Sequence, residues 1–174
     1  MTHAGKSLPS RSLPWKDFAL HYSWLLAAGG ILFLDQLTKW LVRSALPLGA
    51  RVDYLPFMAL VHRSNTGAGF SILTGQNTLL AIAALLALAG VSAMIPSLGD
   101  SEKLLAGIFL GGIMGNLADR LLFQGVTDFI LVHWKELYWP AFNIADAALT
   151  LSVLFFIIRE AYANRSDSSK IQKD

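Results

Sequence analysis

The sequence predicts an all-α integral membrane protein with four transmembrane helices, and three observations lead to this fold class. The 174 residues are 54% hydrophobic and only 15% charged, whereas a soluble domain has about 25% charged residues. Four apolar stretches come close to the ~20 residues that a bilayer-spanning helix needs. The length suits one compact unit, so residues 1–174 are treated as a single membrane-embedded domain.

The four apolar stretches cover about residues 22–42, 78–95, 104–123 and 142–162. Unpaired backbone groups are too costly in lipid, and four spans cannot close a barrel, so each stretch is predicted to be a helix. The second stretch is almost entirely Ala, Leu, Ile and Val. Residues 1–14 and 163–174 are expected to be flexible cytoplasmic tails.

Two of the three connections carry features of their own, and the third, residues 96–103, is a short polar turn. Within the long connection, residues 51–64 are rich in Val, Tyr, Phe and Leu and predict one or two short strands. The last connection, residues 124–141, contains Trp134, Tyr138 and Trp139. Because Trp and Tyr favour the membrane–water boundary, we expect an interfacial loop or helix there.

The distribution of basic residues predicts the orientation. Of the 14 Lys and Arg residues, eight lie near the two chain ends or in the turn at 96–103, and four lie in the other two connections. The positive-inside rule therefore places both termini in the cytoplasm. A cleaved signal peptide is not expected, because no Ala-x-Ala site follows the first apolar run and Asp35 interrupts it.

Polar residues of the spans and connections are predicted to gather at one membrane face, the extracytoplasmic one. Charged residues at this depth are costly and usually functional. The pair Asp35 and Lys39, at i,i+4, also fits a structural ion pair. For the whole set a structural role is disfavoured, because apolar residues would pack there at lower cost. The set is Asp35, Lys39, Asn65, Asn116, Asp119, Arg120, Asp128, Asn143 and Asp146.

Helical spacing groups some of these residues. Asn116 and Arg120 share a face, as do Asn143 and Asp146. Asn143 also fits an N-cap of the fourth span, and Asn65, in an Asn-Thr-Gly sequence, also fits a turn. A glycine repeat at 107, 111 and 115 is interpreted as helix packing that brings the third span close enough for its polar face to meet the fourth.

Several chemistries are excluded by residue type. The chain has no Cys, no G-x-S-x-G and no H-E-x-x-H sequence, and its net charge of +2 gives no basic stripe for nucleic acid. A Ser–Lys pair of Lys39 with Ser44 or Ser64 is not excluded by residue type. No metal or cofactor is implied.

The best candidates that remain are two carboxylates, Asp128 and Asp146. Two carboxylates at one site cannot both ionise easily, so the pKa of one rises. The ionised group takes a proton from water while the protonated group hydrogen-bonds a carbonyl, which is peptide hydrolysis without a covalent intermediate. The pair titrates as a unit, so neither Asp is assigned a separate role. Arg120 is expected to pair with Asp119 or with a substrate carbonyl.

Five segments carry a resemblance to the bacterial lipoprotein signal peptidases, also called signal peptidase II. The segments have the family's order and spacing, and one position departs from the pattern: Gly69 stands where the family more often has Ala or Ser. They are residues 35–39 (DQLTK), 65–70 (NTGAGF), 111–120 (GGIMGNLADR), 126–130 (VTDFI) and 139–146 (WPAFNIAD).

The resemblance implies an aspartic endopeptidase of the bacterial inner membrane, with a small extracytoplasmic β-cradle and its active site at the outer leaflet. Such enzymes remove signal peptides from diacylglyceryl-modified prolipoproteins, cutting just before the lipidated cysteine. Matching positions make Asp128 and Asp146 the catalytic dyad. The implied partners are the lipidated prolipoprotein, membrane lipids and peptide antibiotics such as globomycin. Lining residues would be Asn65, Asn116, Arg120 and Asn143; supporting residues would be Asp35, Lys39 and Asp119.

Two other classes of protein remain as alternatives. A proton-coupled transporter would also place Asp, Asn and Arg inside a bundle, but it predicts polar residues at both leaflets. A structural subunit of a membrane complex predicts that Asp128→Asn leaves any activity intact.

Overall fold

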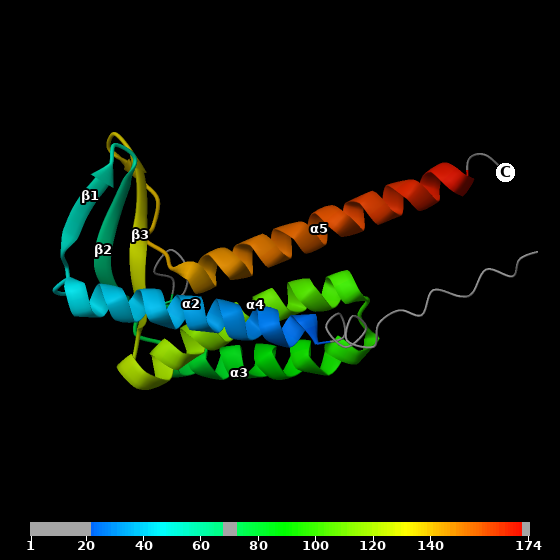
Figure 1. Ribbon diagram of the computed structural model, residues 1–174, viewed down its shortest axis with the longest axis horizontal. Coiled ribbons are helices and arrows are strands. Elements are labelled where there is room, and N and C mark those ends of the chain that lie inside the picture. The colour runs from blue at the N-terminus through cyan, green and yellow to red at the C-terminus, as the bar shows by residue number, and fades with distance from the viewer. Residues whose placement is uncertain (1–21, 68–72, 172–174) are drawn as a thin grey trace, which may run out of the picture.

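The computed structural model describes residues 22–67 and 73–171, with side chains up to residue 162. Four α-helices lie within these ranges, together with a short 3₁₀ turn, η2 (Ile95–Ser97). The sheet stands at one end of the helices, whereas the start of α2 and the end of α5 lie at the other end (Figure 1). The helices are α2 (Ser23–Ala45), α3 (Asn77–Met94), α4 (Asp100–Phe123) and α5 (Ile144–Ile171).

Three of these helices are long and apolar enough to cross a membrane: Ser23–Ala45, Asn77–Ser97 and Asp100–Phe123. Their outer surfaces carry large exposed apolar side chains, such as Phe33 and Leu86, which lipid would cover. The fourth long helix, α5, has the same character along its middle, where Ile157 is exposed. The fold is that of an integral membrane protein with an added sheet.

Helix α4 lies between the others and packs against α2, α3 and α5. The glycine repeat is confirmed as a packing feature: all three glycines face α2, and Gly115 also meets the start of α5, where its Cβ would lie 3.2 Å from that of Ala145. A Cβ at Gly107 would overlap the Trp24 carbonyl oxygen, and one at Gly111 would lie 2.7 Å from that of Ala28. Gly112, which is outside the repeat, packs against the start of α5 too, because its Cβ would lie 2.8 Å from the Ala145 carbonyl oxygen.

The strands form one antiparallel sheet of order β1-β2-β3-β4. Two of them, β1 (Arg51–Leu55) and β2 (Met58–Asn65), confirm the strands predicted for the long connection. The other two, β3 (Val126–Trp134) and β4 (Leu137–Tyr138), correct the prediction of an interfacial loop or helix. The β-branched and aromatic residues of β3 suit a strand, but its partner β2 lies far away in the sequence.

Helix α5 extends further than predicted. It runs to Ile171, whereas the apolar stretch of the fourth span was expected to end at about residue 162. No Gly or Pro follows Tyr162 to stop the helix, and each added residue gains a backbone hydrogen bond once the helix is formed. The predicted N-terminal tail, residues 1–14, and Gly69 lie outside the described residues.

Candidate active site

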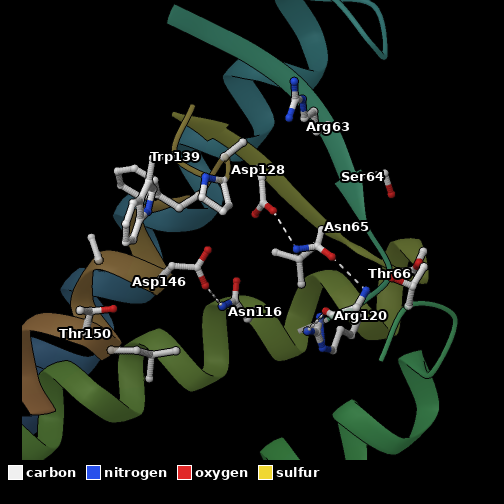
Figure 2. Close-up of a pocket in the computed structure, with 18 of the residues that line it drawn as sticks. Arg63, Ser64, Asn65, Thr66, Asn116, Arg120, Asp128, Trp139, Asp146 and Thr150 are labelled. Carbon is white, nitrogen blue, oxygen red and sulfur yellow. Dashed lines mark hydrogen bonds between the residues drawn. The ribbon is translucent and has the colours of Figure 1, made fainter. Parts of the chain in front are cut away.

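The predicted polar residues meet where the sheet joins the helices (Figure 2). Asp128 is the third residue of β3, and Asp146 lies in the first turn of α5. One group of side chains lines a cavity of about 830 Å³: Asn65, Asn116, Arg120, Asp128 and Asp146. A second group is fully buried behind it, with no exposed surface: Asp35, Lys39, Asp119 and Asn143.

An asparagine amide holds each oxygen of the Asp128 carboxylate. Asn143 Nδ2 donates to Asp128 Oδ1 at 2.8 Å, and Asn65 Nδ2 donates to Asp128 Oδ2 at 3.0 Å. On the other side of the cavity, Asn116 Nδ2 donates to Asp146 Oδ1 at 2.8 Å. Figure 2 shows the Asn65 and Asn116 bonds as dashed lines, with both carboxylates facing the same space.

The Asn143 side chain both caps α5 and contacts Asp128. Its Oδ1 accepts a hydrogen bond from the backbone N–H of Asp146 at 2.9 Å, and Asp146 Oδ2 accepts one from the Asn143 N–H at 3.3 Å. This reciprocal pattern is that of a capping box at the start of a helix. Because the Nδ2 of the same amide reaches Asp128, the cap of α5 also links the two carboxylates.

Asn65 likewise joins a turn to the site. Its Oδ1 accepts a hydrogen bond from the Gly67 N–H at 2.9 Å, which is the side-chain turn expected of an Asn two residues before Gly. Its Nδ2 is thereby left to face Asp128. The turn and the contact with the carboxylate are therefore present together.

Burial sets the protonation of Asp128. The residue is only 4% exposed, and this burial raises the pKa of Asp128 to about 7, with a further rise from the negative charge of Asp146. The amide donors of Asn65 and Asn143 act in the opposite direction. A carboxyl group poised near neutral pH is suited to proton transfer.

Arg120 does not form the predicted pair with Asp119. Its Nη2 donates to the Gly67 carbonyl oxygen at 2.8 Å. Its Nη1 is buried and has no hydrogen-bond partner among the described residues. Asp119 is instead paired with Arg43 Nη1 at 3.3 Å and with Lys39 Nζ at 3.6 Å.

The fully buried charges support the residues around the cavity. Lys39 Nζ lies 2.7 Å from Asp35 Oδ2 and donates to Asn116 Oδ1 at 3.0 Å. Asp35 Oδ1 accepts the Ala145 N–H at 2.9 Å, so it satisfies a backbone donor in the first turn of α5. The ion pair predicted at i,i+4 is present, and it also fixes which end of the Asn116 amide faces Asp146.

The alternative Ser–Lys pair does not form. Lys39 Nζ is occupied by Asp35, Asn116 and Asp119, and the Ser44 hydroxyl donates to the Trp40 carbonyl of its own helix. Among the described residues, no group of three or more His, Asp or Glu side chains is placed to hold a metal ion.

Three residues that the sequence analysis did not single out belong to the buried network. Gln36 Nε2 donates to the Gly115 carbonyl oxygen at 3.0 Å and to Asp119 Oδ1 at 3.2 Å. Arg43 and Thr127 contact each other at 2.9 Å. Position 43 lies one helical turn beyond Lys39 on the same face, and that spacing is the signal that would have found it.

The cavity has both polar and apolar lining residues. Besides the carboxylates, its lining includes Trp139, Phe142 and Leu149. A groove of about 550 Å³ between α3, α4 and α5 shares Asn116, Arg120, Leu149 and Thr150 with the cavity. The rest of this groove is Ala, Leu, Ile, Val and Phe.

Solved structures place this fold among bacterial membrane enzymes. One, described as a bacterial membrane enzyme determined by the in meso method at 2.3 Å resolution, matches with a TM-score of 0.74 at 27% identity, over 82% of this chain and 89% of that chain. A second, at 1.9 Å resolution, matches with a TM-score of 0.67 at 27% identity, over 79% and 91%.

Sequence comparison defines the family. The model of the family described as signal peptidase (SPase) II matches residues 27–162. The lipoprotein signal peptidase of Serratia marcescens is 31% identical over 153 residues, covering 85% of this chain and 90% of the relative. That of Cellvibrio japonicus is 34% identical over 149 residues, covering 82% and 88%. The chain belongs to the signal peptidase II family, whose members cleave signal peptides from prolipoproteins. The resemblance in the five sequence segments is thereby confirmed.

Proposed function

We propose that this protein is an intramembrane aspartic endopeptidase that removes signal peptides from diacylglyceryl-modified prolipoproteins, cutting just before the lipidated cysteine. The observation that carries the proposal is the pair of carboxylates, Asp128 and Asp146, held by asparagine amides and lining one cavity at the sheet end of the helices. Family membership supplies the substrate class.

In the proposed mechanism the two carboxylates share one proton. The ionised carboxylate removes a proton from water as the water oxygen attacks the scissile carbonyl carbon. The protonated carboxyl donates a hydrogen bond to the carbonyl oxygen. The proton taken from water then passes to the leaving amine as the C–N bond breaks. Arg120 Nη1, which has no partner within the part of the chain that the structure describes, is suited to donate to a substrate carbonyl, because an arginine N–H cannot accept.

The proposed membrane placement makes α5 the fourth span and puts both termini in the cytoplasm of the bacterial cell. The site then lies at the outer leaflet of the inner membrane. Two observations support this: the sheet stands at the end of the bundle opposite the start of α2 and the end of α5 (Figure 1), and the basic residues favour the ends of the chain.

Substrate access is proposed through the groove between α3, α4 and α5. A signal peptide is an apolar helix, and the apolar lining of this groove leads to Asn116 and Arg120 at the cavity. The lipidated cysteine would then stand at the depth of the carboxylates. Globomycin-like peptide antibiotics are proposed to occupy the same cavity, and membrane lipids to cover the outer faces of the helices.

A transporter is less compatible with the arrangement. Among the described residues, the buried charged side chains are Asp35, Lys39, Asp119, Arg120 and Asp128, and all take part in the site or its network. Ser152, further along α5, bonds to carbonyls of its own helix. No second set of buried charges in this part of the chain continues a path toward the other end of the helices.

Cleavage of a diacylated prolipoprotein by the purified protein tests the proposal. We expect Asp128→Asn and Asp146→Asn each to lower turnover by at least about 10²–10⁴-fold, the range that general acid–base groups contribute, while the protein still folds in detergent. Asp53→Asn is the matched control, because Asp53 is an exposed carboxylate on β1. Normal turnover in either dyad variant would show that the assignment is wrong, and equal turnover of an unlipidated substrate would contradict the proposed substrate class.

A further inference from the structure

The position of Asp128 depends on how β3 leaves α4. Only Gln124 and Gly125 separate the two elements, and Gln124 has the left-handed φ of 58°. Asp128 follows three residues after Gly125. A small change in the direction of this turn would therefore move the Asp128 carboxylate relative to Asp146.

A cluster of three side chains holds the start of β3 against the helices. Asp119, one turn before the end of α4, accepts the Thr127 N–H at 2.8 Å through Oδ2. Arg43, in the last turn of α2, donates from Nη1 to Thr127 Oγ1 at 2.9 Å and to Asp119 Oδ1 at 3.3 Å. The Arg43 guanidinium also stacks on the Phe123 ring, 4.3 Å from its centre. The cluster joins α2, α4 and β3 at one point.

Alternation along β3 connects this cluster to the site. Successive side chains of a strand point to opposite faces, so Thr127 faces Arg43 and Asp119 while Asp128 lies at the cavity. Holding Thr127 on one face therefore fixes the place of Asp128 on the other. Asp119 already has Lys39 at 3.6 Å and Gln36 at 3.2 Å, so what Arg43 adds is chiefly its contact with Thr127.

We infer that Arg43 and Thr127 are positioning residues that set the Asp128 carboxylate opposite Asp146 for hydrolysis. This inference rests on the proposed function. Neither side chain lines the cavity among the described residues, so both act through the backbone of β3. Arginine suits the task because its planar guanidinium reaches two acceptors and stacks on a ring together, which a lysine ammonium cannot do.

Four variants test the inference with purified protein and a diacylated prolipoprotein. Thr127→Val keeps the side-chain shape and the backbone bond to Asp119 but removes the hydroxyl acceptor; Thr127→Ser keeps the hydroxyl. A misplacement of about 1 Å costs on the order of 10²-fold in rate, so we expect kcat of Thr127→Val and Arg43→Gln to fall by about 10- to 100-fold. KM should stay within about twofold of wild type. Thr127→Ser should have a kcat near that of wild type. The kcat of Arg43→Lys should lie between those of Arg43→Gln and wild type.

Two matched controls accompany these variants. Thr78→Val changes an exposed threonine on α3, away from the cluster, and Arg51→Gln changes an exposed arginine on β1; both should have wild-type kcat. Wild-type kcat in Thr127→Val, or an equal loss in Thr127→Ser, would overturn the positioning role while leaving the proposed function intact. Absence of cleavage by the wild-type protein would instead overturn the proposed function and this inference with it. If Arg43→Gln does not fold, the kcat of Thr127→Val tests the positioning role by itself.

Discussion

Each asparagine at the site uses both ends of its amide. The oxygen of Asn65 accepts the Gly67 N–H, that of Asn116 accepts Lys39 Nζ, and that of Asn143 accepts the Asp146 N–H. In all three the Nδ2 is thereby directed at a carboxylate. Each asparagine that fixes a local turn, cap or ion pair therefore also orients a carboxylate, a double role that needs both the acceptor and the donor of the amide.

At the scale of the residue, the raised pKa of Asp128 predicts how the cleavage rate depends on pH. Burial and the charge of Asp146 raise the pKa of Asp128 to about 7. Below that pH the pair keeps its shared proton, and above it both carboxylates ionise, so the one-proton form is lost as the pH rises through about 7. We expect kcat/KM to fall on the alkaline side with an apparent pKa near 7, measured by prolipoprotein cleavage from about pH 5 to about pH 9.

Unfolding has to be separated from titration in that experiment. Thermal unfolding in detergent, recorded at each pH, serves as the control, because loss of folded protein would also lower the rate. A kcat/KM that is flat between about pH 6 and about pH 9 would contradict a shared proton on this pair.

At the scale of elements, side chains from outside α5 accept the hydrogen bonds of its first backbone N–H groups. The first backbone N–H groups of a helix have no partner within it. Here the Ala145 N–H is taken by Asp35 of α2 and the Asp146 N–H by Asn143. A carboxylate from another helix thus holds the first turn of α5, and with it Asp146, in a fixed place against α2.

Close packing of α4 on α2 gives a second prediction. A Cβ at Gly107 would overlap the backbone of Trp24, at its carbonyl oxygen and Cα, so Gly107→Ala must push the two helices apart. Overpacking of this kind costs about 1–3 kcal/mol, and we expect a lower melting temperature in detergent.

Gly90→Ala on α3 is the matched control for that substitution. No atom lies within 4 Å of the position that a Cβ would take at Gly90, and alanine favours a helix over glycine by up to about 1 kcal/mol, so stability should be equal or higher. Equal melting temperatures for Gly107→Ala and wild type would show that α2 and α4 are not packed this closely.

At the scale of the whole molecule, the orientation can be tested because the chain has no cysteine. Glu136→Cys places a thiol in the turn between β3 and β4, and Ser169→Cys places one near the C-terminus. If the sheet is extracytoplasmic, a membrane-impermeant maleimide should label Glu136→Cys in intact cells with a permeable outer envelope. Ser169→Cys should be labelled only after lysis.

The unsubstituted protein is the blank for labelling, since it has no thiol. Prolipoprotein cleavage by both variants shows that each has inserted correctly. Labelling of Ser169→Cys in intact cells, with Glu136→Cys protected, would reverse the proposed orientation but would leave the clustering of the site residues unchanged.

The sequence by itself determined the features that depend on composition and local spacing. Apolar stretches define the helices because lipid requires internally bonded backbone, and the five segments identify the family. Asp128 and Asp146 stood out as the carboxylates among few charged residues. The strands of residues 51–64 were predicted because their β-branched and aromatic residues show a local pattern.

Only the tertiary structure decided the features that depend on contacts between distant segments. The pairing of β3 with β2 joins Asp128 to Arg63 across the sheet, and no local pattern indicates which strand is the partner. Contacts between distant segments likewise decide that Gly111 faces α2 and Gly112 faces α5. They also decide that Arg120 donates to Gly67 and that Arg43 contacts Thr127. Composition and periodicity fix which residues face inward, whereas the partner each one meets is set by the packing of the whole chain.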